Sequence, residues 1–116
     1  MKSGALRTIK IDWYGEVSVV HISPADWFGG RAIDMKTFDD ANDIIVDDWG
    51  LFCDVLVTAT IGNLRRIPLP VYIVGADGED SVDTTLDVAD VRKAVRDINV
   101  VRAYVDGVLT MIDAAA

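Results

Sequence analysis

Histidine and cysteine, the residue types most often used for nucleophilic and metal chemistry, occur once each in this chain, as His21 and Cys53. A structural zinc site takes about four Cys or His ligands, more than the chain contains. Ser18 and Ser23 flank His21, but no G-x-S-x-G nucleophile motif is present. Glycine-rich nucleotide-binding loops are also absent. The sequence therefore assigns no catalytic residue, no metal ligand and no cofactor.

Two weaker patterns remain for ligand chemistry. Asp12, Tyr14 and His21 fall on one face of a predicted hairpin, which keeps open a small enzyme or ligand-binding domain with a pocket near His21. The acidic loop around Asp77-Gly78 resembles a calcium loop only superficially, because the D-x-[DN]-x-[DN]-G spacing and the terminal Glu are missing.

The strongest chemical signal is acidity. The chain has 116 residues, a formal net charge of −8 and a pI near 4.3. Its acids cluster: residues 34–54 hold seven Asp against the single base Lys36, and residues 77–90 hold six acids and no base. Direct binding to nucleic acid or to an anionic membrane needs a basic patch, so the charge balance argues against both.

Residues 37–49 are predicted to form an amphipathic helix that organises the chain. At 100° per residue, Phe38, Ala41, Ile45 and Trp49 form an apolar stripe, with acids on the opposite face. Like charges four residues apart would cost a few tenths of a kcal/mol per pair, and acids in the last turn oppose the helix dipole. The face is either an ordinary solvated surface or one kept for a basic partner.

The remaining pattern predicts an α+β fold of order ββαββαββ, an antiparallel sheet of three hairpins with two helices packed on it. The first hairpin, residues 7–23, turns at Gly15-Glu16 and opposes Ile9 to Ile22. Strands follow at 51–60 and 65–74, where Pro68 and Pro70 indicate a sheet edge, and a second helix at 86–98. The last hairpin turns at Asp106-Gly107 and opposes Val101 to Ile112. Residues 1–116 form one domain, with frayed ends at 1–5 and 114–116.

Two apolar features could contact partners. Trp27 and Phe28 precede a double glycine and are either a recognition tip or an anchor tucked beneath the loop. Tyr104, Leu109 and Met111 share the second face of the last hairpin, which is either a patch for a homodimer or partner, or is covered by the 75–83 loop.

These features favour a non-enzymatic acidic protein that docks on a basic, nucleic-acid-binding surface of a partner such as a nuclease and blocks it. The expected contact residues are Asp39, Asp40, Asp43, Asp47, Asp48, Asp77, Glu79, Asp80 and Asp83, with aromatic contacts from Trp27 and Phe28. In size, acidity and pattern the chain resembles phage anti-defence inhibitors (anti-CRISPR and anti-restriction DNA mimics) and toxin immunity proteins. That resemblance is of class rather than motif, so it implies no functional positions.

Alternatives to inhibition are the enzyme or ligand-binding domain and a virion or assembly protein that uses the Tyr104–Met111 face. No signal peptide or membrane span is recognisable in the sequence, so the expected location is the cytoplasm, that of the host cell if the protein is phage-encoded.

Overall fold

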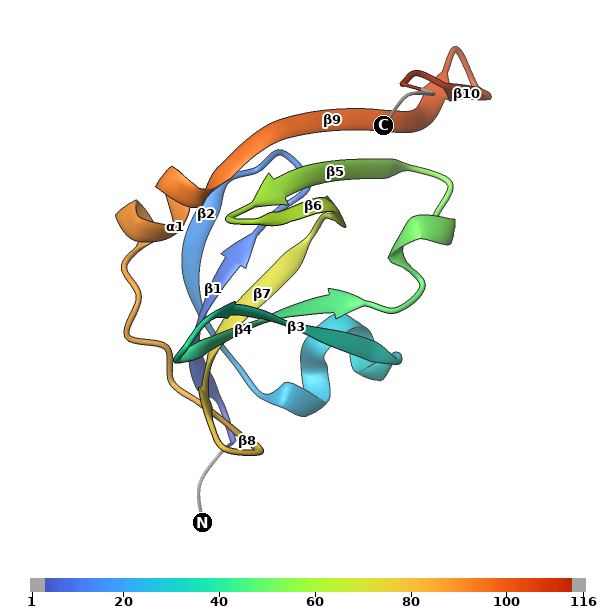
Figure 1. The fold of residues 1–116 in the computed structure, drawn as a ribbon. Coiled ribbons are helices and arrows are strands. Elements are labelled where there is room, and N and C mark those ends of the chain that lie inside the picture. The colour runs from blue at the N-terminus through green and yellow to red at the C-terminus, as the bar shows by residue number, and fades with distance from the viewer. Residues whose placement is uncertain (1–3, 114–116) are drawn as a thin grey trace.

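The computed structural model describes residues 4–113, which form ten strands and only short helical segments (Figure 1). In chain order the elements are β1 (Leu6–Ile11), β2 (Val17–Ile22), the 3₁₀ segment η1 (Pro24–Gly30), β3 (Ile33–Asp39), β4 (Asn42–Asp47), the 3₁₀ turn η2 (Gly50–Phe52), β5 (Leu56–Ile61), β6 (Leu64–Pro68), β7 (Val71–Asp77), β8 (Asp80–Val82), α1 (Val88–Ala94), β9 (Val95–Val105) and β10 (Val108–Met111).

The strands form two antiparallel sheets. Sheet A has the order β2-β1-β7-β4-β3, with β8 also paired to β7, and sheet B has the order β10-β9-β5-β6. The strands β6 and β7 are consecutive in the chain but lie in different sheets, and the chain passes from one to the other through Leu69-Pro70. The order ββαββαββ with one sheet and two packed helices is therefore wrong: the fold is mostly β, with one sheet curled into a half-barrel.

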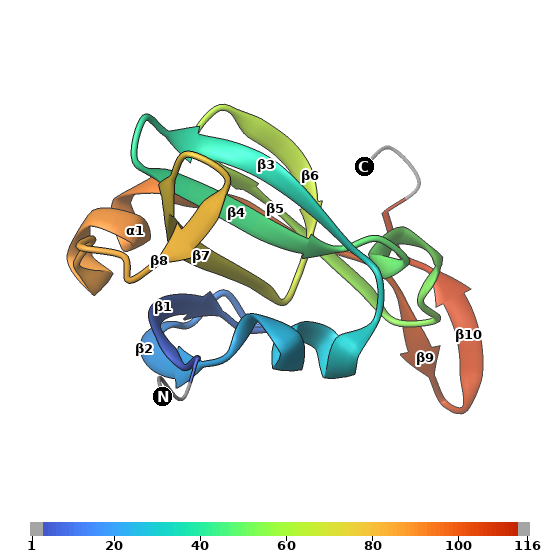
Figure 2. The same cartoon turned by 90° about the horizontal axis from the view of Figure 1, so that it is seen from below.

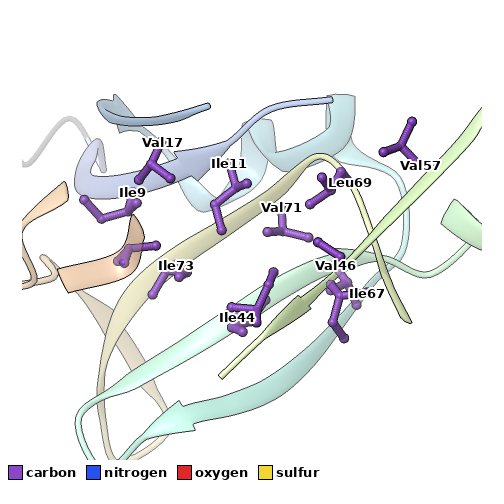
Figure 3. Packing of buried hydrophobic residues seen from close by; sticks show 13 residues of the cluster. Ile9, Ile11, Val17, Ile44, Val46, Val57, Ile67, Leu69, Val71 and Ile73 are labelled. Carbon is purple, nitrogen blue, oxygen red and sulfur yellow. The ribbon is translucent and has the colours of Figure 1, made fainter. Parts of the chain in front are cut away.

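The main hydrophobic core lies between the two sheets. Figure 3 shows side chains of sheet A, among them Ile44, Val71 and Ile73, pointing toward the same interior as Ile67 of sheet B. A second, smaller core on the other face of sheet A contains Trp27, Phe28, Ile45, Tyr72 and Val74. Because both faces of sheet A are covered, β4 buries the consecutive residues Ile44, Ile45 and Val46.

The predicted acidic helix at 37–49 does not exist. The segment is a hairpin in which β3 pairs with β4 around the turn Asp40-Ala41. The Asp39 carboxylate accepts hydrogen bonds from the Ala41 backbone N–H (2.8 Å) and from the Asn42 side-chain amide (2.9 Å), which fixes the turn. The β-branched residues at 44–46 favour a strand. This local preference and the pairing of β4 with its neighbours both outweigh the helical spacing of the apolar residues.

Three further elements differ from expectation. The first hairpin pairs Ile9 with Val19 rather than Ile22, because its loop spans residues 12–16 and not Gly15-Glu16 alone. The register differs from the expected one by three residues. Because this number is odd, the β2 side chains that share a face with a given β1 residue are not the expected ones. The expected helix at 86–98 is helical only over Val88–Ala94 and continues as β9. The expected strand at 65–74 is divided between β6 and β7.

The sheet edge and the last hairpin agree with the sequence. β6, which contains Pro68, lies at an edge of sheet B. The pairs Val105–Val108 and Ala103–Thr110 have the register expected for a turn at Asp106-Gly107. Of the frayed ends expected at 1–5 and 114–116, residues 1–3 and 114–116 lie outside the described residues, whereas Gly4 and Ala5 are exposed. Within the part described, no helix is long and apolar enough to span a membrane.

Candidate interaction surfaces

The end of β9 and all of β10 project from the body as a two-stranded arm, defined here as residues 101–112 (Figure 2). The molecule extends 48 Å along its longest axis against 21 Å along its shortest. Large apolar side chains are exposed on both faces of the arm, by 44–64%: Tyr104, Val105, Val108, Leu109, Met111 and Ile112. Exposed apolar side chains grouped in this way are typical of contact surfaces.

The root of the arm is fixed by polar contacts to the segment before β5. The Arg102 guanidinium donates hydrogen bonds to the carbonyl oxygens of Leu51 (2.6 Å) and Cys53 (2.7 Å). The Tyr104 hydroxyl donates to the Asp54 carboxylate (2.7 Å), and this hydrogen bond raises the pKa of the phenol above its ordinary value of 10.0. These contacts hold the projecting strand in a defined orientation.

Further apolar surface lies beside this root. Trp49, Leu51 and Phe52 are exposed by 59%, 51% and 75%, and the rings of Trp49 and Phe52 lie 5.8 Å apart. An apolar depression of about 390 Å³ also adjoins the root, lined by Trp13, Tyr14, Val55, Val57, Ile98, Val100 and Ala103. The arm is thus the extension of a larger apolar surface.

The outer edge of β10 differs from the other sheet edges. Edge strands are usually protected against pairing by charges, proline or a covering element. β6 carries Arg65, Arg66 and Pro68, β3 carries the ion pair between Lys36 and Asp34 (3.3 Å), and α1 contacts β2. β10 contains only Val108, Leu109, Thr110 and Met111, and no strand of residues 4–113 pairs with its outer side. In the part of the chain described, its outer side lacks charged side chains, proline and a pairing strand, and it is called here the unprotected edge.

Five of the nine acids expected to bind a partner gather at the opposite end of the molecule. The β3–β4 turn and the β7–β8 turn are neighbours, because β4 pairs with β7 and the Ala76 N–H donates to the Ala41 carbonyl oxygen (2.8 Å). This acidic end comprises the exposed residues Asp39, Asp40, Asp77, Glu79 and Asp80. None of the five forms an ion pair with another residue of the part described. Figures 1 and 2 place these turns away from the arm.

The other four acids do not belong to that group. Asp43 is half-buried on β4, and Asp83 accepts a hydrogen bond from the Arg7 backbone N–H (2.8 Å). Asp47 lies at the far end of β4 and forms an ion pair with Arg31 (2.6 Å), which raises the pKa of that guanidinium. Asp48 is exposed beside it. A single acidic face across 39–48 is therefore not formed.

Trp27 and Phe28 are buried, with 3% and 9% of their surfaces exposed. Phe28 packs edge-on against Tyr72, with ring centroids 5.2 Å apart, and has a positive φ of 52°. The pair anchors η1 to sheet A, and neither side chain is accessible for the aromatic contact expected from the sequence.

The residues of the expected pocket near His21 are separated. His21 pairs with Arg7 toward one end of the first hairpin, whereas Asp12 lies in the loop at the other end. There its carboxylate accepts hydrogen bonds from the N–H groups of Tyr14 and Glu16, both at 2.9 Å. Tyr14 is 85% exposed. This arrangement fixes the loop and brings no acid–base pair together.

Comparison with protein-family models, with curated proteins and with solved structures finds no match to this chain. Functional interpretation therefore rests on the surfaces themselves. Tyr104, Leu109 and Met111 were identified from the sequence, but the exposure of Val105 and Val108 was not. Val105 and Val108 lie on the same face of the hairpin as the buried Val101. They are exposed because this part of β9 extends beyond the body of the protein.

Proposed function

We propose that this chain is a non-enzymatic assembly protein that joins a second copy of itself through the arm. The supporting observation is the combination, on one projecting hairpin, of apolar side chains on both faces and an unprotected edge strand. A fold that protects its other edges and leaves one long apolar hairpin open has the features of an interface.

A second copy is favoured as the occupant by the chemistry of β10. An antiparallel strand can pair with its own copy about a two-fold axis, so the same surface serves both partners. The four residues of β10 bring no formal charge to the contact, which matters because each copy has a net charge of −8. Pairing would join sheet B of the two copies into one continuous sheet and bury Val108 and Met111.

Light scattering coupled to size-exclusion chromatography tests this proposal. The expected result is a dimer that dissociates on dilution and persists in 1 M NaCl, since apolar contacts are not weakened by screening. The double variant Val108→Lys, Met111→Lys is expected to be monomeric, because lysines on two paired edges repel and protect the edge.

The control is Met35→Lys, which adds one positive charge at an exposed residue (46%) of a different edge strand, β3. It is expected to dimerise like the wild type. A wild-type chain that stays monomeric at about 1 mM, a concentration at which weak specific dimers form, would overturn the proposal. So would a dimer that the arm variant leaves unchanged.

The acidic end favours a second candidate function, docking on a basic surface of a partner protein. Its support is the convergence of two acidic turns that are far apart in sequence, with no internal cation paired to them in the part described. Such a surface would steer association and select the partner by charge. Self-repulsion between acids on a helix lends no support to this function, since residues 33–47 form the β3–β4 hairpin.

This second function is tested by comparing two variants of equal net charge. Asp40→Lys, Asp77→Lys, Glu79→Lys changes the acidic end, whereas Glu16→Lys, Asp26→Lys, Asp48→Lys changes exposed acids elsewhere. A basic partner purified from the producing cell should bind the second variant and the wild type more tightly than the first, with an affinity that falls as salt rises. Equal loss in both variants would indicate a non-specific charge effect and contradict docking at this end.

A further inference from the structure

An open pocket of about 570 Å³ lies on the outer face of sheet B and has the opposite charge to the rest of the molecule. Among the described residues, three arginines, Arg65, Arg66 and Arg96, line it together with one acid, Asp97. The whole chain has 11 basic and 19 acidic residues, so this concentration of arginine is not a sample of the average surface. The group is called here the arginine pocket.

The floor of the arginine pocket is polar. Thr58 and Thr60 alternate with core residues along β5 and line the pocket from below, with only 4% and 8% of their surfaces exposed. Neither hydroxyl forms a hydrogen bond with another residue in the 4–113 range. Both hydroxyls line the hollow without a partner among those residues, so they are free to donate to an acceptor that enters it.

The backbone around the pocket is irregular on both sides of β5. The pairing of β5 with β6 shifts between Ala59 and Ile61, and its pairing with β9 shifts between Thr58 and Thr60. Arg66 and Asp97, which both line the pocket, have positive φ values of 56° and 52°. Bulges and left-handed non-glycine residues re-aim side chains and are common beside binding sites. Here they bring side chains from three strands to one hollow.

We infer that the arginine pocket binds a small molecule through a phosphate or carboxylate group. Arginine guanidinium groups match the geometry of either oxyanion and can hold it with paired hydrogen bonds. Arg96 spends one donor on the Gly62 carbonyl oxygen (3.0 Å) and so has its orientation fixed, with its other N–H groups left for a ligand. The threonine hydroxyls and the Asn99 amide add neutral donors. An extended polyanion is disfavoured because the chain as a whole has a net charge of −8.

The test is a titration of the ¹⁵N-labelled protein with inorganic pyrophosphate and, separately, with citrate. The expected result is saturable shifts of the Thr58, Thr60 and Asn99 amide signals, with a dissociation constant below about 1 mM for at least one anion. Saturation by pyrophosphate alone assigns a phosphate-bearing ligand, saturation by citrate alone assigns a carboxylate-bearing one, and saturation by both assigns a site for either oxyanion.

Variants connect the shifts to the pocket. Arg65→Ala with Arg96→Ala should weaken binding by about tenfold or more, the usual effect of losing charge-assisted hydrogen bonds. Thr60→Val, which keeps the shape and removes one hydroxyl, should weaken it several-fold. Arg92→Ala with Lys93→Ala on α1 removes the same charge from exposed positions and should leave binding unchanged. No saturable shift with either anion, or equal weakening in both double variants, would overturn the inference.

Discussion

The guanidinium of Arg102 on β9 donates a 2.6 Å hydrogen bond to the backbone carbonyl oxygen of Leu51, 51 residues earlier in the chain. A second bond from the same nitrogen reaches the Cys53 carbonyl oxygen. The arm is therefore anchored to the segment before β5 by one side chain in addition to strand pairing. Its orientation depends on that side chain.

Replacing Arg102 by Met retains the apolar stem and removes both hydrogen bonds. We expect the free energy of unfolding in urea to fall by about 1–2 kcal/mol, the usual effect of losing charged hydrogen bonds that are partly exposed. Amide hydrogen exchange of residues 101–112 should accelerate by more than that of β5. Arg92→Met on α1 is the control, and equal loss of stability in both variants would contradict an anchoring role.

The Tyr104–Asp54 hydrogen bond predicts a stability change at alkaline pH. Because the folded state raises the pKa of Tyr104 above 10.0, the contribution is fully present below pH 10 and is lost as pH rises through the folded-state value. The stability difference between wild type and Tyr104→Phe should therefore be constant from pH 7 to 9 and shrink above pH 10. Thermal unfolding across that range measures it, and a difference independent of pH would contradict the assignment.

A buried hydrogen bond ties the start of β4 to the segment before α1. The Thr84 hydroxyl donates to the Asn42 side-chain carbonyl oxygen at 2.6 Å, and both residues are at most 4% exposed. Thr84→Val should cost about 1–3 kcal/mol, because it leaves the Asn42 acceptor buried without a partner. In a double-mutant cycle with Asn42→Ala, the two losses should not add. Additive losses would show that the pair is not coupled.

Two substitutions in the former helix segment distinguish a strand from a helix. Ile44 is fully buried, whereas Trp49, which belonged to the apolar stripe of the expected helix, is 59% exposed. Ile44→Ala should lower the free energy of unfolding by about 2–5 kcal/mol, and Trp49→Ala should change it by less than about 1 kcal/mol. Denaturant unfolding followed by circular dichroism shows which substitution lowers the free energy of unfolding more. A larger effect at Trp49 would favour the helix.

The sequence predicts an element correctly where its local residues are compatible with only one structure. Asp106-Gly107 fixes both the position and the register of the last hairpin, and Pro68 marks an edge because proline has no N–H to donate. The segment 37–49 has two solutions, since Phe38, Ala41, Ile45 and Trp49 match a helical period while Ile44-Ile45-Val46 matches a strand buried on both faces. Long-range pairing of β4 with β7 selects the strand, and no local pattern contains that information.

The candidate surfaces follow the same division. The acids at 39–40 and 77–80 are visible in the sequence as two groups, but their meeting at one end depends on the β4–β7 pairing. The arginine pocket is harder to foresee, because Arg65 and Arg96 come from different strands of sheet B and are brought together by irregular pairing. The sequence predicts one apolar face of the arm, at Tyr104, Leu109 and Met111. It does not predict how far the arm extends from the body of the protein.

The passage of the chain between layers at Leu69-Pro70 has a consequence for how the molecule comes apart. The consecutive strands β6 and β7 belong to sheets B and A, and the Leu69 N–H donates a hydrogen bond to the Val57 carbonyl oxygen of sheet B (2.9 Å). Because the connection between them is so short, one sheet cannot separate from the other without disturbing it. We expect a single melting transition for residues 4–113, and circular permutants opened between 69 and 70 should fold poorly, whereas new termini in the exposed loop at Gly78 should be tolerated.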